Sequence, residues 1–92
     1  MIRLRGQLIC TTDAEQAAVH LHMSAHIAAS RAEPACLSFD IAATDDPMVF
    51  EVMEAFRDRA GFDAHQARTR ISPWWQATKD ILRAFRMEEL GD

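Results

Sequence analysis

Two runs of alternating apolar residues, separated by a five-residue turn, constrain the fold of this 92-residue chain more than any other feature. In the first run, Leu37, Phe39 and Ile41 alternate with other residues, which is the period of a strand whose two faces have different surroundings. The turn at residues 43–47 contains two aspartates and a proline, which favour tight turns. A second apolar run follows at residues 48–56. The sequence therefore predicts a β-hairpin.

A capped helix follows the hairpin, and a shorter helix follows the first. Asp58 is placed to accept hydrogen bonds from the free backbone N–H groups of residues 59–67, so we expect a helix there that carries one histidine, His65. Ser72 precedes a proline, which is the typical pairing of an N-cap with the first helical position. This pairing predicts a short helix at residues 74–79.

The remaining segments complete an alternating order of strands and helices. Apolar periodicity predicts a strand at residues 2–10, a helix at residues 14–32 and a final strand at residues 81–87. Residues 88–92 are expected to form a loose tail. The order β-α-β-β-α-β is that of the ferredoxin-like α+β fold, a four-stranded antiparallel sheet with helices on one face. We expect a single domain over residues 1–92.

The predicted hairpin is apolar on both faces, and this predicts a dimer. Its apolar residues divide between one face with Leu37, Phe39, Ile41, Val49 and Met53 and another with Phe50, Val52 and Phe56. Helices on one side of the sheet can cover only one of these faces. Because soluble monomers rarely expose a large apolar patch, we expect a symmetric homodimer that packs sheet against sheet.

The long predicted helix has two apolar sides. Small side chains let a helix lie close to a sheet, so we expect the alanine-rich side to face the sheet. That side consists of Ala14, Ala17, Ala18, Leu21, Ala25 and Ala28. Val19, Met23 and Ile27 lie on the other side, where they need a covering partner.

Composition and charge indicate a folded protein outside several functional classes. Apolar residues make up 49% of the chain and charged residues 26%, which is ordinary for a globular protein. The net charge of −4 argues against binding nucleic acid or an anionic membrane by general electrostatic attraction. No apolar stretch is long enough for a signal core or a membrane span, so we expect a cytoplasmic protein. Cys10 and Cys36 each lie in a predicted strand and are expected to be small buried thiols. Neither belongs to a C-x-x-C pair, so cysteine-based zinc binding and thioredoxin-like redox chemistry find no support.

Several short motifs occur together in one known family. They are Glu33-Pro34-x-Cys36-Leu37-x-Phe39, Asp46-Pro47 with Phe50, Glu54-x-Phe56, and Asp58-Arg59-Ala60-x-Phe62-Asp63-Ala64-His65. In these residues, and in the order of its elements from residue 2 to about residue 87, the chain resembles the antibiotic biosynthesis monooxygenase family of small dimeric α/β barrels. The resemblance is to its quinol-monooxygenase-like members in particular.

The resemblance implies a function as well as a fold. It implies a cofactor-independent monooxygenase that oxidises a phenolic or quinol-type aromatic, with dioxygen as co-substrate and no metal. In proteins similar to this one, the residue matching His65 borders the pocket between the helices and the sheet. A histidine there can act as a general base. From the sequence alone, a partly buried histidine bonded to a backbone carbonyl is an open alternative.

Aromatic residues supply candidate walls for such a pocket. Trp74 and Trp75 are adjacent, so on a helix they point about 100° apart, and we expect only Trp75 to face the pocket. Together with Phe50 and Phe56 it would line an apolar slot for a flat aromatic ligand. Simple filling of the core explains the same residues equally well.

Glu54 interrupts an apolar strand, and a carboxylate there needs a partner or contact with water. It can orient His65 or pair with Arg83, and we include it among the pocket residues. A purely structural ion pair is the main alternative to a catalytic role.

His22 and His26 stand four residues apart on the first helix, a spacing that can hold a metal between two imidazoles. No third ligand is evident, so we expect them at the edge of the helix, and we include His26 among the pocket residues. The individual roles of the two histidines stay open.

Two other functions are compatible with the resemblance. Some relatives degrade haem, but they carry a tryptophan where this chain has His65 and need an asparagine, and the sequence contains none. A non-catalytic dimer that binds a small aromatic ligand is the alternative from another class. The sequence leaves open the substrate, the pathway, whether turnover occurs, and whether the last strand crosses to the neighbouring subunit.

Overall fold

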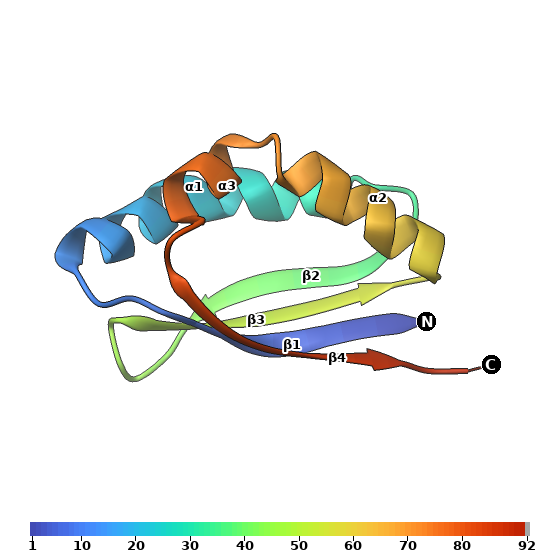
Figure 1. The fold of residues 1–92 in the computed structure, drawn as a ribbon, viewed down its shortest axis with the longest axis horizontal. Coiled ribbons are helices and arrows are strands. Elements are labelled where there is room, and N and C mark those ends of the chain that lie inside the picture. Colours follow the sequence, from blue (N-terminus) through green and yellow to red (C-terminus); the bar gives the residue numbers. More distant parts are fainter. Residues whose placement is uncertain (92) are drawn as a thin grey trace.

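Four strands and three helices follow one another in the predicted order (Figure 1). The computed structural model describes residues 1–91. The elements are β1 (Ile2–Ile9), α1 (Asp13–Arg31), β2 (Cys36–Ala43), β3 (Val49–Phe56), α2 (Arg59–Thr69), α3 (Pro73–Thr78) and β4 (Leu82–Glu89).

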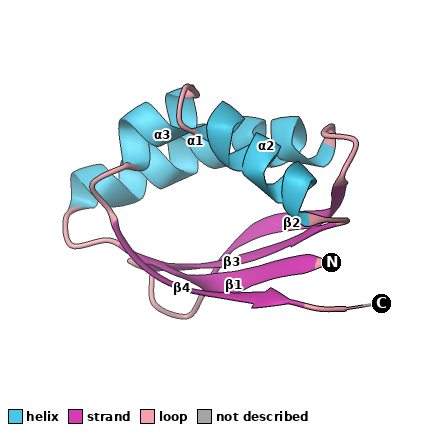
Figure 2. Cartoon of the chain, turned by 45° about the vertical axis from the view of Figure 1, so that its right-hand side comes forward, coloured by secondary structure: helices cyan, strands magenta, loops and turns pink. Residues whose placement is uncertain are grey.

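The strands form one antiparallel sheet in the order β2-β3-β1-β4, and all three helices lie on one side of it (Figures 1 and 2). This is the ferredoxin-like arrangement, so the predicted α+β fold class is confirmed. On β1, Leu4 lies opposite Glu54 of β3, and Leu8 lies opposite Arg83 of β4. Because Leu4 and Leu8 are buried under the helices, this register also places Glu54 and Arg83 on the helix-covered face.

Side-chain caps fix where each helix begins. The Asp58 carboxylate accepts from the backbone N–H of Gly61, and the Ser72 hydroxyl accepts from the backbone N–H of Trp75, as the sequence predicted. Helix α1 is capped by Thr12, which accepts from Glu15 N–H, rather than by Asp13. Such caps satisfy backbone donors that the helices leave free.

The predicted division of the hairpin into two apolar faces is wrong. Phe39 lies opposite Glu54 and Ile41 opposite Val52, so both join Phe50 on the helix-covered face. The turn length visible in the sequence does not fix this register, and an irregularity between Cys36 and Ser38 shifts it further. The uncovered face of the sheet instead mixes apolar residues with charged ones, and the charged ones are Arg3, Arg5, Asp40, Glu51, Arg86 and Glu88.

The predicted orientation of α1 is also reversed. Val19 is fully buried against the sheet, and Met23 and Ile27 pack against the same core. The alanine-rich side faces outward, and Leu21 on that side is 76% exposed. The larger side chains occupy the core because their burial removes more apolar area from water than burial of alanine does.

Strand β4 extends two residues beyond its predicted end, through Glu88 and Glu89, where the sequence suggested a loose tail. Pairing continues to Leu90, whose N–H donates to the carbonyl of Met1. The last residue of that predicted tail, residue 92, lies outside the described residues. Within residues 1–91, no helix combines the length and the apolar character that a membrane span requires.

Candidate active site

A cavity of about 190 Å³ lies between the sheet and the helices. Its apolar wall comes from Leu4, Leu8, Phe39, Ile41, Val52, Trp74, Trp75 and Phe85, and its polar wall from His26, Glu54, His65, Gln66, Thr69, Arg70 and Arg83. Strands β1 to β4 supply the floor, and the ends of α2 and α3 supply the roof. The cavity therefore combines an apolar wall with a polar wall of similar size, which together can hold a small molecule and fix its orientation.

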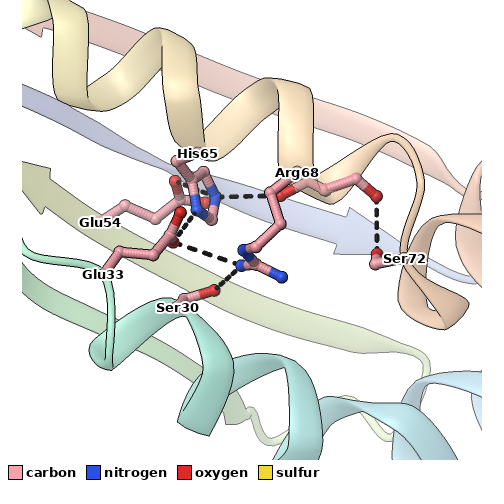
Figure 3. Close-up of polar contacts among 7 residues, drawn as sticks. Ser30, Glu33, Glu54, His65, Arg68 and Ser72 are labelled. Carbon is pink, nitrogen blue, oxygen red and sulfur yellow. Dashed lines mark hydrogen bonds and ion pairs between the residues drawn. The ribbon is translucent and has the colours of Figure 1, made fainter.

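His65 lines this cavity and is held by the carboxylate of Glu33, as Figure 3 shows. The side chain is 1% exposed, and Nδ1–H donates to Glu33 Oε1 at 2.7 Å. Because a carboxylate only accepts hydrogen bonds, this contact assigns the proton to Nδ1 and leaves the lone pair on Nε2. Nε2 lies 3.4 Å from Thr69 Oγ1 and 3.6 Å from Glu54 Oε1, and both of those residues line the cavity.

Glu33 is itself anchored on its other side. Arg68 Nη2 lies 3.3 Å from the same Oε1 and also donates to Ser30 Oγ at 3.0 Å, so the chain Ser30–Arg68–Glu33–His65 spans α1 and α2 (Figure 3). Burial alone raises the pKa of Glu33, but the hydrogen bonds from Arg68 and His65 outweigh it and hold that pKa below its usual value. Glu33 is therefore a carboxylate at neutral pH.

Burial lowers the pKa of His65, and the bonded Glu33 carboxylate opposes only part of that shift. The imidazole is therefore neutral at neutral pH. A neutral ring with Nδ1–H fixed by a carboxylate presents a basic nitrogen to the cavity. This is the arrangement that a general base requires.

Glu54 differs from Glu33 although both flank the same ring. It is 8% exposed, and its Oε1 has no hydrogen-bond partner among residues 1–91. Burial, helped by the nearby Glu33 charge, raises the pKa of Glu54 to about 7. Near neutral pH this carboxyl is thus divided between its acid and its carboxylate, next to the basic nitrogen of His65.

His26 and Trp74 form a stacked pair on the wall of the cavity. Their ring centroids are 4.9 Å apart with planes 3° from parallel, and His26 is 5% exposed with no partner for Nδ1 among the described residues. Burial, with the nearby His65 and Arg68, lowers the pKa of His26 to about 4. The ring is therefore a neutral aromatic wall. His22 lies in a neighbouring pocket, and within residues 1–91 no three potential ligands cluster around a metal position.

The structure brings four of the predicted site residues to the cavity and places two elsewhere. His65, Glu54, Trp75 and His26 line it. Phe50 and Phe56 do not: Phe50 is fully buried with its ring against His20, and Phe56 packs against Phe62 and against the His65 ring at 4.8 Å.

Several contributors were not identified from the sequence. Glu33 lies 32 residues from His65 and meets it only through the fold. Arg68 and Thr69 follow His65 by one helical turn, so their presence on the same side of α2 was visible in the spacing. Trp74 was expected to point away because it is adjacent to Trp75, yet the short helix α3 presents both rings to the cavity.

Comparisons with known proteins agree on one family. The family described as Antibiotic biosynthesis monooxygenase matches residues 1–83. Among solved structures, a protein from Nitrosomonas europaea assigned to that class shares 24% identity over 97% of each chain, with a TM-score of 0.82. Rv0793 from Mycobacterium tuberculosis shares 19% identity over 99% of this chain and 95% of that one, with a TM-score of 0.81. SnoaB, a cofactor-independent oxygenase from Streptomyces nogalater, shares 10% identity over 99% of this chain and 93% of its own, with a TM-score of 0.77. No curated protein matches the chain in sequence.

Proposed function

The chain belongs to the antibiotic biosynthesis monooxygenase family, and from this premise we propose that it is a cofactor-independent monooxygenase that oxidises a phenolic or quinol-type aromatic with dioxygen. One observation carries the proposal. The buried His65 is oriented by Glu33 so that its basic nitrogen borders an apolar cavity. The description of SnoaB as a cofactor-independent oxygenase supports the same chemistry in this fold.

In the proposed reaction, His65 Nε2 takes the proton of the substrate hydroxyl. The resulting anion gives one electron to dioxygen, and the substrate radical and superoxide then combine to a peroxide anion, which takes the proton back from His65 to become a hydroperoxide. Loss of one water from the hydroperoxide leaves a quinone, so that a phenol plus dioxygen gives a quinone plus water. The substrate therefore supplies all the electrons, and the protein moves protons, excludes water and orients the ring.

The cavity favours a small aromatic over a porphyrin. At about 190 Å³ it lies below the range of roughly 300–1,000 Å³ of sites for drug-sized ligands. Flat walls of Trp74, Trp75 and Phe39 suit one or two rings. We expect no Soret shift when haemin is added, and a shift would favour the haem-degrading alternative.

We also propose a homodimer, on grounds that differ from those of the sequence. Phe85 and Met87 of β4 point to the helix side of the sheet but are 37% and 44% exposed. Helix α1 packs along β2 and α2 packs on β3, which leaves this edge of the sheet uncovered. A second copy that covers β4 would also close the cavity at Phe85. Sedimentation as a stable monomer at micromolar concentration would contradict this. A cytoplasmic location stays a prediction from the sequence.

Oxygen uptake with a panel of hydroquinones tests the activity. His65→Gln keeps a polar side chain but removes the base, so we expect the rate to fall about 10²- to 10⁴-fold. His22→Gln is the matched control, since His22 lies outside the cavity, and it should keep the wild-type rate. Equal rates for wild type and His65→Gln would reject the proposed base. Ligand-induced thermal stabilisation without oxygen uptake would instead support a non-catalytic binding protein.

A further inference from the structure

Arg83 is a half-buried arginine at the wall of the cavity, and its guanidinium is fixed in place. Nη1 donates to the carbonyls of Thr78 at 2.8 Å and Ile81 at 3.0 Å, and Nη2 donates to Thr78 Oγ1 at 3.1 Å. The guanidinium carbon also lies 5.1 Å from the centre of the Trp75 ring. An arginine held by three hydrogen bonds and a ring is preorganised.

The charge of Arg83 has no counterpart in the protein. Within residues 1–91, no acidic side chain forms an ion pair with it, and all three of its acceptors are neutral oxygens. Burial lowers the pKa of Arg83 below its usual value, which marks a charge partly removed from water. An unpaired guanidinium on the wall of a cavity is available to an anionic group of a ligand.

The guanidinium has a free edge of the right shape for that anion. Nη1 uses both of its hydrogens on backbone carbonyls, and Nη2 uses one on Thr78. The Nε hydrogen and one Nη2 hydrogen have no acceptor among the described residues. These two donors lie side by side on one edge of the guanidinium, where a carboxylate binds with two parallel hydrogen bonds.

Arg83 and Glu54, the neighbour of the base, start from well-separated backbone positions on the floor of the cavity. Arg83 is opposite Leu8 on β1, whereas Glu54, which adjoins His65, is opposite Leu4 from the strand on the other side of β1. With strands about 4.8 Å apart and about 3.4 Å per residue, the two backbone positions are roughly 17 Å apart. The wall between them is apolar, with Leu4, Leu8 and Val52 among its members.

We infer that Arg83 is the binding site for an anionic group of the substrate, and that the substrate class is therefore a hydroxyaromatic carboxylate, with its hydroxyl at His65 and its carboxylate at Arg83. This inference rests on the proposed function for the hydroxyl end only. The carboxylate end follows from the unpaired arginine and the free edge of its guanidinium. Arg70, which is exposed, also lines the cavity and adds a second positive charge to its wall.

Binding of 4-hydroxybenzoate and of its uncharged analogue 4-hydroxybenzamide tests the inference. Both tryptophans line the cavity and the chain has no tyrosine, so quenching of tryptophan emission reports binding directly, and calorimetry provides a second measurement. The titration is run near pH 6, below the pKa of about 7 of Glu54, where that carboxyl is mostly neutral. We expect the wild type to bind the acid at least about tenfold more tightly than the amide, because a charged acceptor strengthens both hydrogen bonds.

Arg83→Gln should abolish this preference. We expect the affinity for 4-hydroxybenzoate to fall about tenfold and the affinity for 4-hydroxybenzamide to change less than about twofold. Arg86→Gln is the matched control: Arg86 is on the same strand but opposite Arg5, on the uncovered face of the sheet, and its replacement should leave the preference unchanged. If Arg83 were only a structural cap for α3, its replacement would affect both ligands equally, and this outcome would overturn the inference.

The wild-type comparison stands even if Arg83→Gln fails to fold. Equal affinity for acid and amide, or no binding of either at millimolar concentration, overturns the inference. Oxygen uptake with neutral hydroquinones but no preference for the acid would leave the proposed function intact and reject the Arg83 site. Conversely, if binding of the acid is preferred and depends on Arg83 but no phenol causes oxygen uptake, the Arg83 site is supported and the proposed monooxygenase function is rejected.

Discussion

The most direct physical test of the site is the substitution Glu54→Gln. Gln has the shape of a protonated glutamic acid but cannot titrate, so the substitution removes one ionisation and little else. Glu54 is 8% exposed, and its Oε1 has no partner among residues 1–91. We therefore expect the variant to fold and to differ from wild type mainly in how its stability depends on pH.

The size of the effect follows from the pKa of Glu54, which burial raises from 4.5 to about 7. Between these values the unfolded chain has lost the proton that the folded chain keeps, so the contribution of Glu54 to stability is present below pH 4.5 and is lost as pH rises through 7. At about 1.4 kcal/mol for each unit of pKa, that loss is about 3 kcal/mol. The uncharged amide of the variant suffers no such loss. The variant should match wild type near pH 4.5 and exceed it by about 3 kcal/mol above pH 7.

Urea unfolding of both proteins from pH 4 to pH 8, followed by tryptophan fluorescence, measures this difference. Protein concentration must be equal throughout, because a dimer would make apparent stability depend on it. The informative quantity is the difference between the two unfolding free energies at each pH, since titrating groups far from Glu54 cancel in it. A difference that stays constant with pH would refute the reasoning, because Glu54 would then titrate alike in both states.

In wild type alone, the effect of Glu54 is masked by His26. Burial lowers the pKa of His26 from 6.5 to about 4, so its contribution to stability is present above 6.5 and is lost as pH falls toward 4. Between pH 4.5 and 6.5 the two residues therefore change stability in opposite directions, each by about 1.4 kcal/mol per pH unit. The pKa of His65 is also lowered, so its contribution to stability changes with pH in the same direction as that of His26. The unfolding free energy of wild type is therefore expected to depend only weakly on pH, although the separate contributions of Glu54 and His26 are large.

Three further predictions concern the base, the sheet and a helix cap. Glu33→Gln replaces an obligate acceptor with a group that can also donate to His65 Nδ1, so oxygen uptake should fall by about 10²-fold or more, and the imidazole NMR titration should move to lower pH. Gly6→Ala places a methyl group against the β4 backbone and should cost about 1–3 kcal/mol in urea unfolding or prevent folding, whereas Gly91→Ala, with open space around it, should change stability by less than about 0.5 kcal/mol. Ser72→Ala removes the α3 cap and should cost about 1 kcal/mol by the same measurement; no change would show that the cap is dispensable.

The sequence predicted the order and bounds of the elements well because these depend on local chemistry. Asp58 and Ser72 cap their helices as expected, since a cap involves a few neighbouring residues. The sides of the elements were harder to predict. Phe39 was placed on the wrong face of the sheet, and Val19 on the wrong side of its helix. Both depend on register and on competition for the core, which periodicity alone does not determine.

The same limit explains which part of the site could be predicted. His65 was identifiable from its place on the predicted helix and from the family resemblance, and Glu54 as a carboxylate in an apolar strand; both line the cavity. Glu33 has no such local signal, because it belongs to the connection that precedes β2 and meets the ring only after folding. Its role as orienting carboxylate could equally have gone to Glu54. The structure distinguishes the two carboxylates, because Arg68 forms an ion pair with Glu33 and not with Glu54.

The charges around the cavity are consistent with the substrate class inferred from Arg83. Near pH 6 the Glu33 carboxylate is balanced by Arg68, with which it shares a contact of 3.3 Å. His26 is largely neutral because burial lowers its pKa to about 4, and Glu54 is largely neutral because burial raises its pKa to about 7. Burial also lowers the pKa of His65, which favours its neutral form. What remains on the cavity wall is the positive charge of Arg83 and of Arg70, neither of which forms an ion pair within residues 1–91. A site with unpaired positive charge and a nearby base is complementary to an anion that still carries a proton to give, which is the ionisation state of a hydroxyaromatic carboxylate at that pH.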